Sequence, residues 1–139
     1  MVKRNVLIRK VEQIERHLAK LKIYQELSCA AFLDHADAQD IITFNLFQAV
    51  NNLISMIEHV VVDEGYGLPE SASHAAEILV RQKILTARDL QIMCQMAGFR
   101  NIIALQYADI DQKKVHAALR CAGKDIRGIV KKLTKRFKL

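Results

Sequence analysis

Apolar residues recur at steps of three and four through almost the whole sequence, which is the spacing of one face of an α-helix. The first such row is Leu7, Val11, Ile14, Leu18 and Leu21. One proline and five glycines in 139 residues leave few positions at which helices can be interrupted. An all-β fold needs many more turns, so the pattern predicts an all-α chain.

Breaks in this pattern divide the chain into four long helices and one short one. The expected segments are about 2–27, Ile42 to Gly65, roughly 71–82, Thr86 to Asp109, and Asp111 onward. Gly65 suits a left-handed C-cap, and Thr86 with Asp89 has the spacing of a capping box. Short connections between long helices predict an antiparallel helical bundle, a single domain over residues 1–139.

The second long helix carries two adjacent apolar stripes. One stripe includes Ile42, Leu46 and Leu53, and the other includes Phe47 and Ile54. A helix that is apolar over so wide an arc must be covered from two sides. It is therefore either the central helix of its bundle or part of a subunit interface, and the second reading predicts a homodimer.

Basic residues are concentrated at the two ends of the chain. Residues 1–10 and 131–139 hold nine of the 21 basic residues and no acidic residue, so the remaining 120 residues are net acidic. If the first and last helices are antiparallel, these basic ends meet at one end of the bundle. They can serve an anionic partner such as RNA, or they can oppose the negative end of a helix dipole.

Few chemical signatures are present elsewhere. No apolar run is long enough for a membrane span, and three cysteines without paired spacing suit reduced thiols in a cytoplasmic protein. The five histidines have no metal-ligand spacing, and glycine-rich phosphate loops are missing. We therefore expect no membrane, no metal and no cofactor.

The segment from Ala97 to Tyr107 differs from a plain structural helix. Gly98 stands in a helical apolar face two residues before Arg100, and glycine there costs about 1 kcal/mol relative to alanine. This suggests close approach of a backbone or a ligand. The structural alternative is a buried Arg100 paired with a carboxylate, with Tyr107 as a half-buried cap.

Two stretches carry a family resemblance: Gly65–Ser71, with the sequence GYGLPES, and Met96–Asn101, with the sequence MAGFRN. They resemble the turn and the motif lead-in of the HepT-like branch of the HEPN superfamily, the toxins of HEPN–nucleotidyltransferase toxin–antitoxin pairs. The family signature is Arg, four residues, His, one residue, Tyr. Arg100 and Tyr107 stand at its positions, whereas its histidine position holds Leu105.

The resemblance implies an all-α homodimer that cleaves RNA without a metal in a type VII-like toxin–antitoxin system. It implies that Arg100 stabilises the phosphate, with Asn101 in support. It also implies an MntA-like nucleotidyltransferase antitoxin that transfers AMP onto Tyr107, where the added negative charge would block RNA entry.

Leu105 cannot transfer protons, and losing such help costs about 10²–10⁴-fold in rate. The resemblance therefore implies an impaired ribonuclease. The chain is a degenerate toxin kept as a binding partner, a toxin detoxified by substitution, or a protein in which His59 or His116 supplies the proton transfer. The third reading is the least favoured because neither histidine has the motif's spacing to Arg100. The alternative function is a non-catalytic helical subunit that partners a nucleotidyltransferase.

Overall fold

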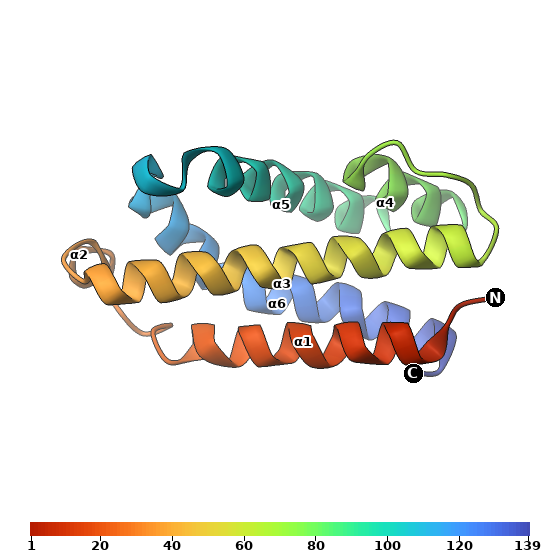
Figure 1. The fold of residues 1–139 in the computed structure, drawn as a ribbon, viewed down its shortest axis with the longest axis horizontal. Coiled ribbons are helices and arrows are strands. Elements are labelled where there is room, and N and C mark those ends of the chain that lie inside the picture. The colour runs from red at the N-terminus through yellow and green to blue at the C-terminus, as the bar shows by residue number, and fades with distance from the viewer.

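In the computed structural model, which describes residues 1–139, one long helix runs through the middle of the molecule and the others pack around it (Figure 1). The elements in chain order are α1 (Arg4–Lys22), α2 (Cys29–Leu33), α3 (Ala36–Asp63), α4 (Ala72–Arg81), α5 (Ala87–Gln106), the 3₁₀ turn η1 (Tyr107–Asp109) and α6 (Gln112–Phe137). The prediction of an all-α bundle with four long helices is confirmed. No helix combines the length and the apolarity needed to cross a membrane.

α3 is the central helix. It packs against all five of the other helices, and half of its 28 residues are buried. The two apolar stripes are therefore largely covered within one chain, as expected for the central helix of a bundle. The breadth of its apolar face no longer argues for a dimer.

The structure has six α-helices, one more than the sequence predicts. The segment between the first two long helices forms α2, whose N-cap Ser28 accepts a hydrogen bond from the Ala31 N–H at 3.1 Å. α1 ends at Lys22 and not near residue 27, because the next backbone amides bond to carbonyls only three residues back, Tyr24 N–H to Leu21 O among them. Such tight turns end an α-helix.

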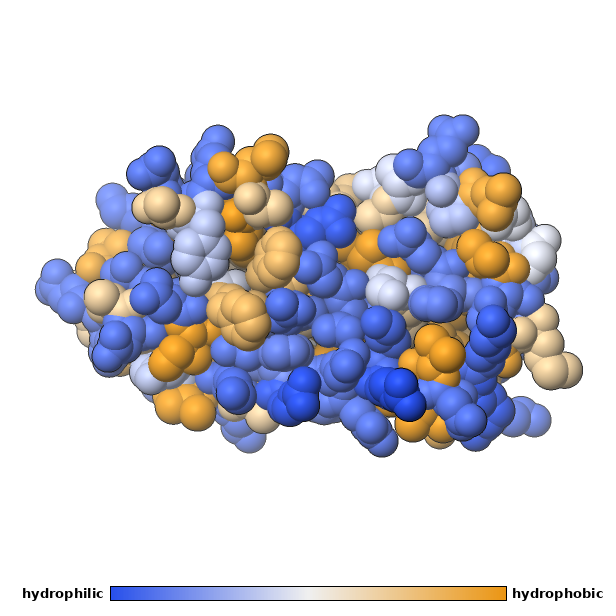
Figure 2. All heavy atoms as spheres, in the orientation of Figure 1, coloured by the Kyte–Doolittle hydropathy of each residue, from blue (hydrophilic) through white to orange (hydrophobic).

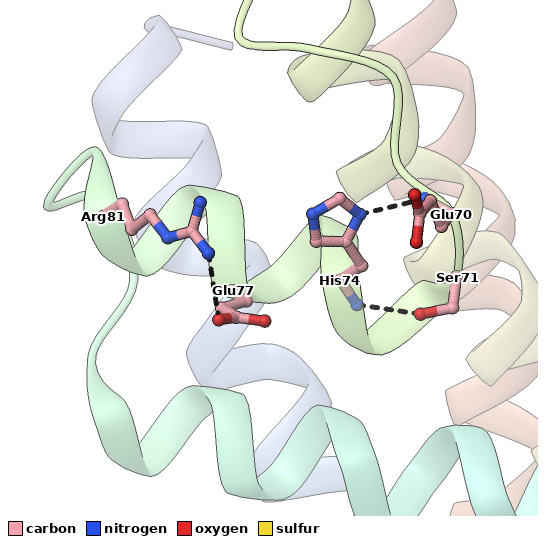
Figure 3. Close-up of polar contacts among 5 residues, drawn as sticks. All are labelled: Glu70, Ser71, His74, Glu77 and Arg81. Atoms are coloured by element: carbon pink, nitrogen blue, oxygen red, sulfur yellow. Dashed lines mark hydrogen bonds and ion pairs between the residues drawn. The ribbon is translucent and has the colours of Figure 1, made fainter.

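The second long helix begins at Ala36 and not at Ile42, because the His35 side chain caps it there by accepting from the Ala38 N–H. Three other predicted helix ends are confirmed. Gly65 follows α3 in the left-handed region at φ +72°. Thr86 and Asp89 form a capping box at the start of α5. Figure 3 shows the start of α4, where the Ser71 hydroxyl accepts from the His74 N–H at 3.0 Å and the His74 ring accepts from the Glu70 N–H at 3.0 Å.

Both chain termini lie at one end of the bundle, and the C-terminal end of α5 lies at the other (Figure 1). The Arg4 guanidinium donates to the backbone oxygens of Phe137, at 3.1 Å, and Lys138. Tyr107 shares a cavity with Ile23 and Tyr24, just beyond the C-terminal end of α1. The basic ends therefore meet far from the motif, as antiparallel first and last helices require.

Candidate functional site

Arg100 lies in the last third of α5, partly buried against α3. Its Nη1 donates to the Asn51 Oδ1 on α3 at 3.3 Å, and its Nε donates to the Asn101 Oδ1 at 3.0 Å. Both acceptors are neutral amides, so the arginine is not paired with a carboxylate, contrary to the structural alternative. A guanidinium has five N–H donors, and those of Arg100 not bonded to the two amides remain free for an anion.

Asn101 is exposed at the next position of α5 and contributes only its amide oxygen to Arg100. Together with Asn51 it holds the guanidinium from two sides without neutralising it. This geometry suits a supporting role for Asn101.

Tyr107 follows Arg100 by seven residues, directly after the last residue of α5, and its side chain also contacts α3. It is the C-cap of α5 and is 46% exposed. Its hydroxyl donates weakly to the backbone oxygen of Asp40 on α3, at 3.5 Å. Burial, followed by the negative charge of Asp40, raises the pKa of Tyr107 above its ordinary value of 10.0.

Leu105 lies on a different side of α5. Five residues correspond to a rotation of about 140° from Arg100, and the Leu105 side chain is 83% exposed. A side chain at this position therefore faces away from α3 and does not complete a site with Arg100 inside one chain.

A polar cavity of about 450 Å³ lies between α3 and Arg100. Its lining residues come from the outer face of α3 and from one position of α5, namely Asn51, Ile54, Ser55, Glu58, His59, Val62 and Arg100. The spacing of His59 to Arg100 along the chain does not match the family motif. The packing of α3 against α5 nevertheless brings the two residues to one cavity, although they are 41 residues apart in the chain.

The other four histidines are all occupied by hydrogen bonds within the chain. His17 bonds to Asn45 at 2.8 Å, and His35 caps α3 by accepting from the Ala38 N–H at 3.1 Å. His74 accepts from the Glu70 N–H, and the buried His116 bonds to the Leu27 backbone oxygen at 2.8 Å. His59 has no hydrogen bond within the chain, so its ring is free to meet a ligand.

An apolar surface adjoins Tyr107 along the seam between α3 and α5. Phe44 is 50% exposed and Ile23 is 74% exposed, and cavities of about 570 and 220 Å³ both border Phe44 and Tyr107. Figure 2 shows tan and orange side chains gathered over this part of the molecule, at the end where α2 lies. We call the residues Ile23, Phe44 and Tyr107 the motif-end apolar patch.

The expectation for Gly98 is not met within the chain. Gly98 is exposed on α5, and a side chain added there would meet no atom within 4 Å. The three cysteines are free thiols, and no group of three or more His, Cys, Asp or Glu side chains is placed to hold a metal ion.

Comparison with known proteins places this geometry in context. A family model described as "Ribonuclease HepT-like" matches residues 14–133. A search of curated proteins gave no match.

Solved structures share the fold over nearly the whole chain. A toxin–antitoxin crystal structure with AMP-PNP superimposes with a TM-score of 0.85 at 19% identity, covering 94% of this chain and 98% of the other. A mutant of the toxin–antitoxin MntA-HpeT gives 0.84 at 20% identity with the same coverage. The tri-AMPylated HEPN toxin of Shewanella oneidensis, in complex with its MNT antitoxin, gives 0.84 at 20% identity, covering 94% and 97%.

Proposed function

The chain belongs to the HepT-like ribonuclease family, and from that premise we propose that it is the toxin component of a type VII-like HEPN–nucleotidyltransferase toxin–antitoxin system. It is an endoribonuclease, which cuts RNA at internal positions, and it acts without a metal in the cytoplasm. As written, with Leu105 at the histidine position, it is an impaired ribonuclease.

The observation that carries this proposal is the arrangement of Arg100 and Tyr107. Both lie on the α3 side of the last turns of α5, and Arg100 is held by two amide oxygens that leave its charge intact. A guanidinium offers phosphate a planar, permanently charged set of donors. Such a group stabilises the extra negative charge that develops on phosphorus during cleavage.

Leu105 removes the proton transfer that the family motif supplies. Because an alkyl side chain can neither accept nor donate a proton, we expect a rate about 10²–10⁴-fold below that of a chain with histidine there. The exposure of Leu105 makes the position open to substitution without disturbing the core.

The partner is an antitoxin nucleotidyltransferase of the MntA kind. Two similar structures are described as complexes with an MntA or MNT antitoxin, one of them tri-AMPylated. Tyr107 suits such a modification because its ring is 46% exposed at the end of α5. An added phosphate there would bring negative charge to the face that carries Arg100 and would oppose RNA binding.

A homodimer would complete the site. The motif-end apolar patch leaves large hydrophobic side chains in solvent, which is typical of a surface that another molecule covers. Light scattering of the pure protein should give twice 15.8 kDa. A monomer that persists at high micromolar concentration would contradict the dimer.

The direct test of the function is Leu105→His. Total RNA is incubated in EDTA with the unchanged protein, with Leu105→His, and with Leu105→His carrying Arg100→Ala, and growth is followed on induction. We expect the histidine variant to cut RNA about 10²–10⁴-fold faster than the parent and to slow growth, and Arg100→Ala to abolish both effects. If Leu105→His neither cuts RNA nor slows growth, the ribonuclease function is wrong.

In that event the alternative stands, a non-catalytic helical subunit that presents Tyr107 to a nucleotidyltransferase. Leu105 is the observation that favours it. Pull-down with an MntA-like nucleotidyltransferase, together with AMP incorporation at Tyr107 but not in Tyr107→Phe, would support this function without any RNA cleavage.

A further inference from the structure

We propose that His59 accepts the proton of the ribose 2′-hydroxyl when this chain cleaves RNA, and that the scissile phosphate lies between His59 and Arg100 in the polar cavity on α3. The proposal rests on the ribonuclease function put forward above. It assigns the proton transfer to a residue outside the family signature.

The first support is the location of His59. It lies near the C-terminal end of α3, on the face that borders the 450 Å³ cavity containing Arg100. The cavity is open to solvent, so an RNA strand can reach both side chains. Because α3 is the central helix of the bundle, its backbone holds the imidazole at a fixed place relative to α5.

The second support is that the His59 ring is unoccupied. Each of the other four histidines is engaged by a hydrogen bond within the chain. A histidine that is partly buried in a polar cavity and has no partner in its own chain is free to bond to a substrate hydroxyl. Imidazole titrates near neutral pH, as a general base requires.

The third support is the chemistry of the remaining lining groups. Asn51 binds the Arg100 guanidinium at 3.3 Å and so directs it along the cavity. Glu58 supplies a carboxylate and Ser55 a hydroxyl. A guanidinium for phosphate, a carboxylate that accepts from a ribose hydroxyl, and a free imidazole match a ribonucleotide better than an apolar ligand.

The reaction is a transesterification without oxidation or reduction. His59 takes the proton from the 2′-hydroxyl, the 2′-oxygen forms a bond to phosphorus, and the bond from phosphorus to the 5′-oxygen breaks. Water protonates the leaving 5′-oxygen, and the imidazolium returns its proton to solvent. The products are a 2′,3′-cyclic phosphate and a 5′-hydroxyl end.

The test uses the full chain at enzyme excess in EDTA, with a labelled RNA and the same RNA carrying a 2′-deoxyribose at the cut site. His59→Gln is compared with His74→Gln, a matched change on α4 that keeps a polar acceptor. We expect His59→Gln to lose about 10² of the cleavage rate and His74→Gln to retain it. Thermal melting of both variants establishes that they are folded, and free imidazole should restore cleavage by His59→Ala.

Several results would overturn the proposal while leaving the ribonuclease function standing. One is equal cleavage by His59→Gln and the parent. Another is a parent that does not cut although Leu105→His does. A third is loss of cleavage that imidazole does not restore and that is accompanied by weaker RNA binding, since His59 would then bind RNA and not transfer a proton. If neither the parent nor Leu105→His cuts RNA, the ribonuclease function itself fails and this proposal fails with it.

Discussion

Replacing Asp89 by alanine should destabilise the fold measurably, because this carboxylate ties two helices together. Asp89 is buried at the start of α5, and its Oδ2 accepts from the Thr86 N–H at 2.8 Å. The same oxygen accepts from the Lys132 Nζ of α6 at 2.5 Å. Alanine removes half of the capping box and the interhelical ion pair together.

The expected loss of folding free energy is the sum of two contributions, from the helix cap and from the ion pair. Loss of a helix cap costs about 1 kcal/mol. Breaking a fully buried ion pair costs about 3–5 kcal/mol, but the Lys132 side chain is 41% exposed and regains water, so about 1 kcal/mol is appropriate. The sum is about 2 kcal/mol, which lowers the Tm of a chain of this size by about 8 °C.

The pH dependence of this effect has a defined sign. Burial alone would raise the pKa of Asp89, but the hydrogen bond from Lys132, those from Thr86 and the positive charge of Lys132 outweigh it and hold the pKa below 3.8. A lowered folded-state pKa stabilises the protein fully above the unfolded value of about 3.9, and this stability is lost as pH falls through the folded value.

Thermal unfolding of the parent, Asp89→Ala, Asp89→Asn and Lys132→Met, followed by circular dichroism, measures both effects. Asp89→Asn keeps the shape but not the charge, so it should lie between the parent and Asp89→Ala at neutral pH. The difference between the parent and Asp89→Asn should shrink in acid. A difference that grows on acidification, or an Asp89→Ala variant as stable as the parent, would refute the reasoning.

Three further predictions concern the glycines, the basic tail and the tyrosine. Gly98→Ala should stabilise the fold by up to about 1 kcal/mol, because Gly98 is exposed and helical with open space around it. Gly65→Ala should destabilise the fold by about 1–2 kcal/mol, because Gly65 has a left-handed backbone at φ +72°. Urea unfolding measures both changes. Neutralising exposed tail lysines should weaken nonspecific RNA binding and its salt dependence but leave AMP transfer onto Tyr107 intact, and loss of that transfer would contradict the separation of the two ends. The lysines to change are Lys131, Lys135 and Lys138, since Lys132 is paired with Asp89. A near-ultraviolet titration of the parent against Tyr107→Phe should place the Tyr107 pKa above 10.0.

The long helices could be predicted because each buries an apolar stripe. The residues of such a stripe are only three or four positions apart in the sequence, so the pattern is visible locally. α2 could not, because five residues hold too few apolar positions to show a period. Its order comes from the Ser28 cap and from burial of Phe32 against the rest of the core. The end of α1 was missed for a related reason, since the helical period gives no sign of the tight turns after Lys22.

Arg100, Leu105 and Tyr107 could be found from sequence because they are neighbours on one helix and share a motif. His59 could not be linked to them, because its proximity to Arg100 arises only from the packing of α3 against α5. One signal was present. Helical steps of four, three and four place Asn51, Ser55, Glu58 and Val62 on one face of this helix. A mostly polar row on the most buried helix indicates a surface that the chain's own core leaves open.

The two faces of α3 therefore have different roles, one in packing and one in the site. The inner face, with Leu53, Met56 and Val60 fully buried, fixes where the helix lies. The outer face then places His59 and Asn51 relative to Arg100. His59 approaches Arg100 from the α3 side, whereas position 105 lies about 140° away around α5. Because position 105 does not complete a site with Arg100 inside one chain, a histidine there adds a proton-transfer group only across the proposed homodimer and does not reproduce the role proposed for His59.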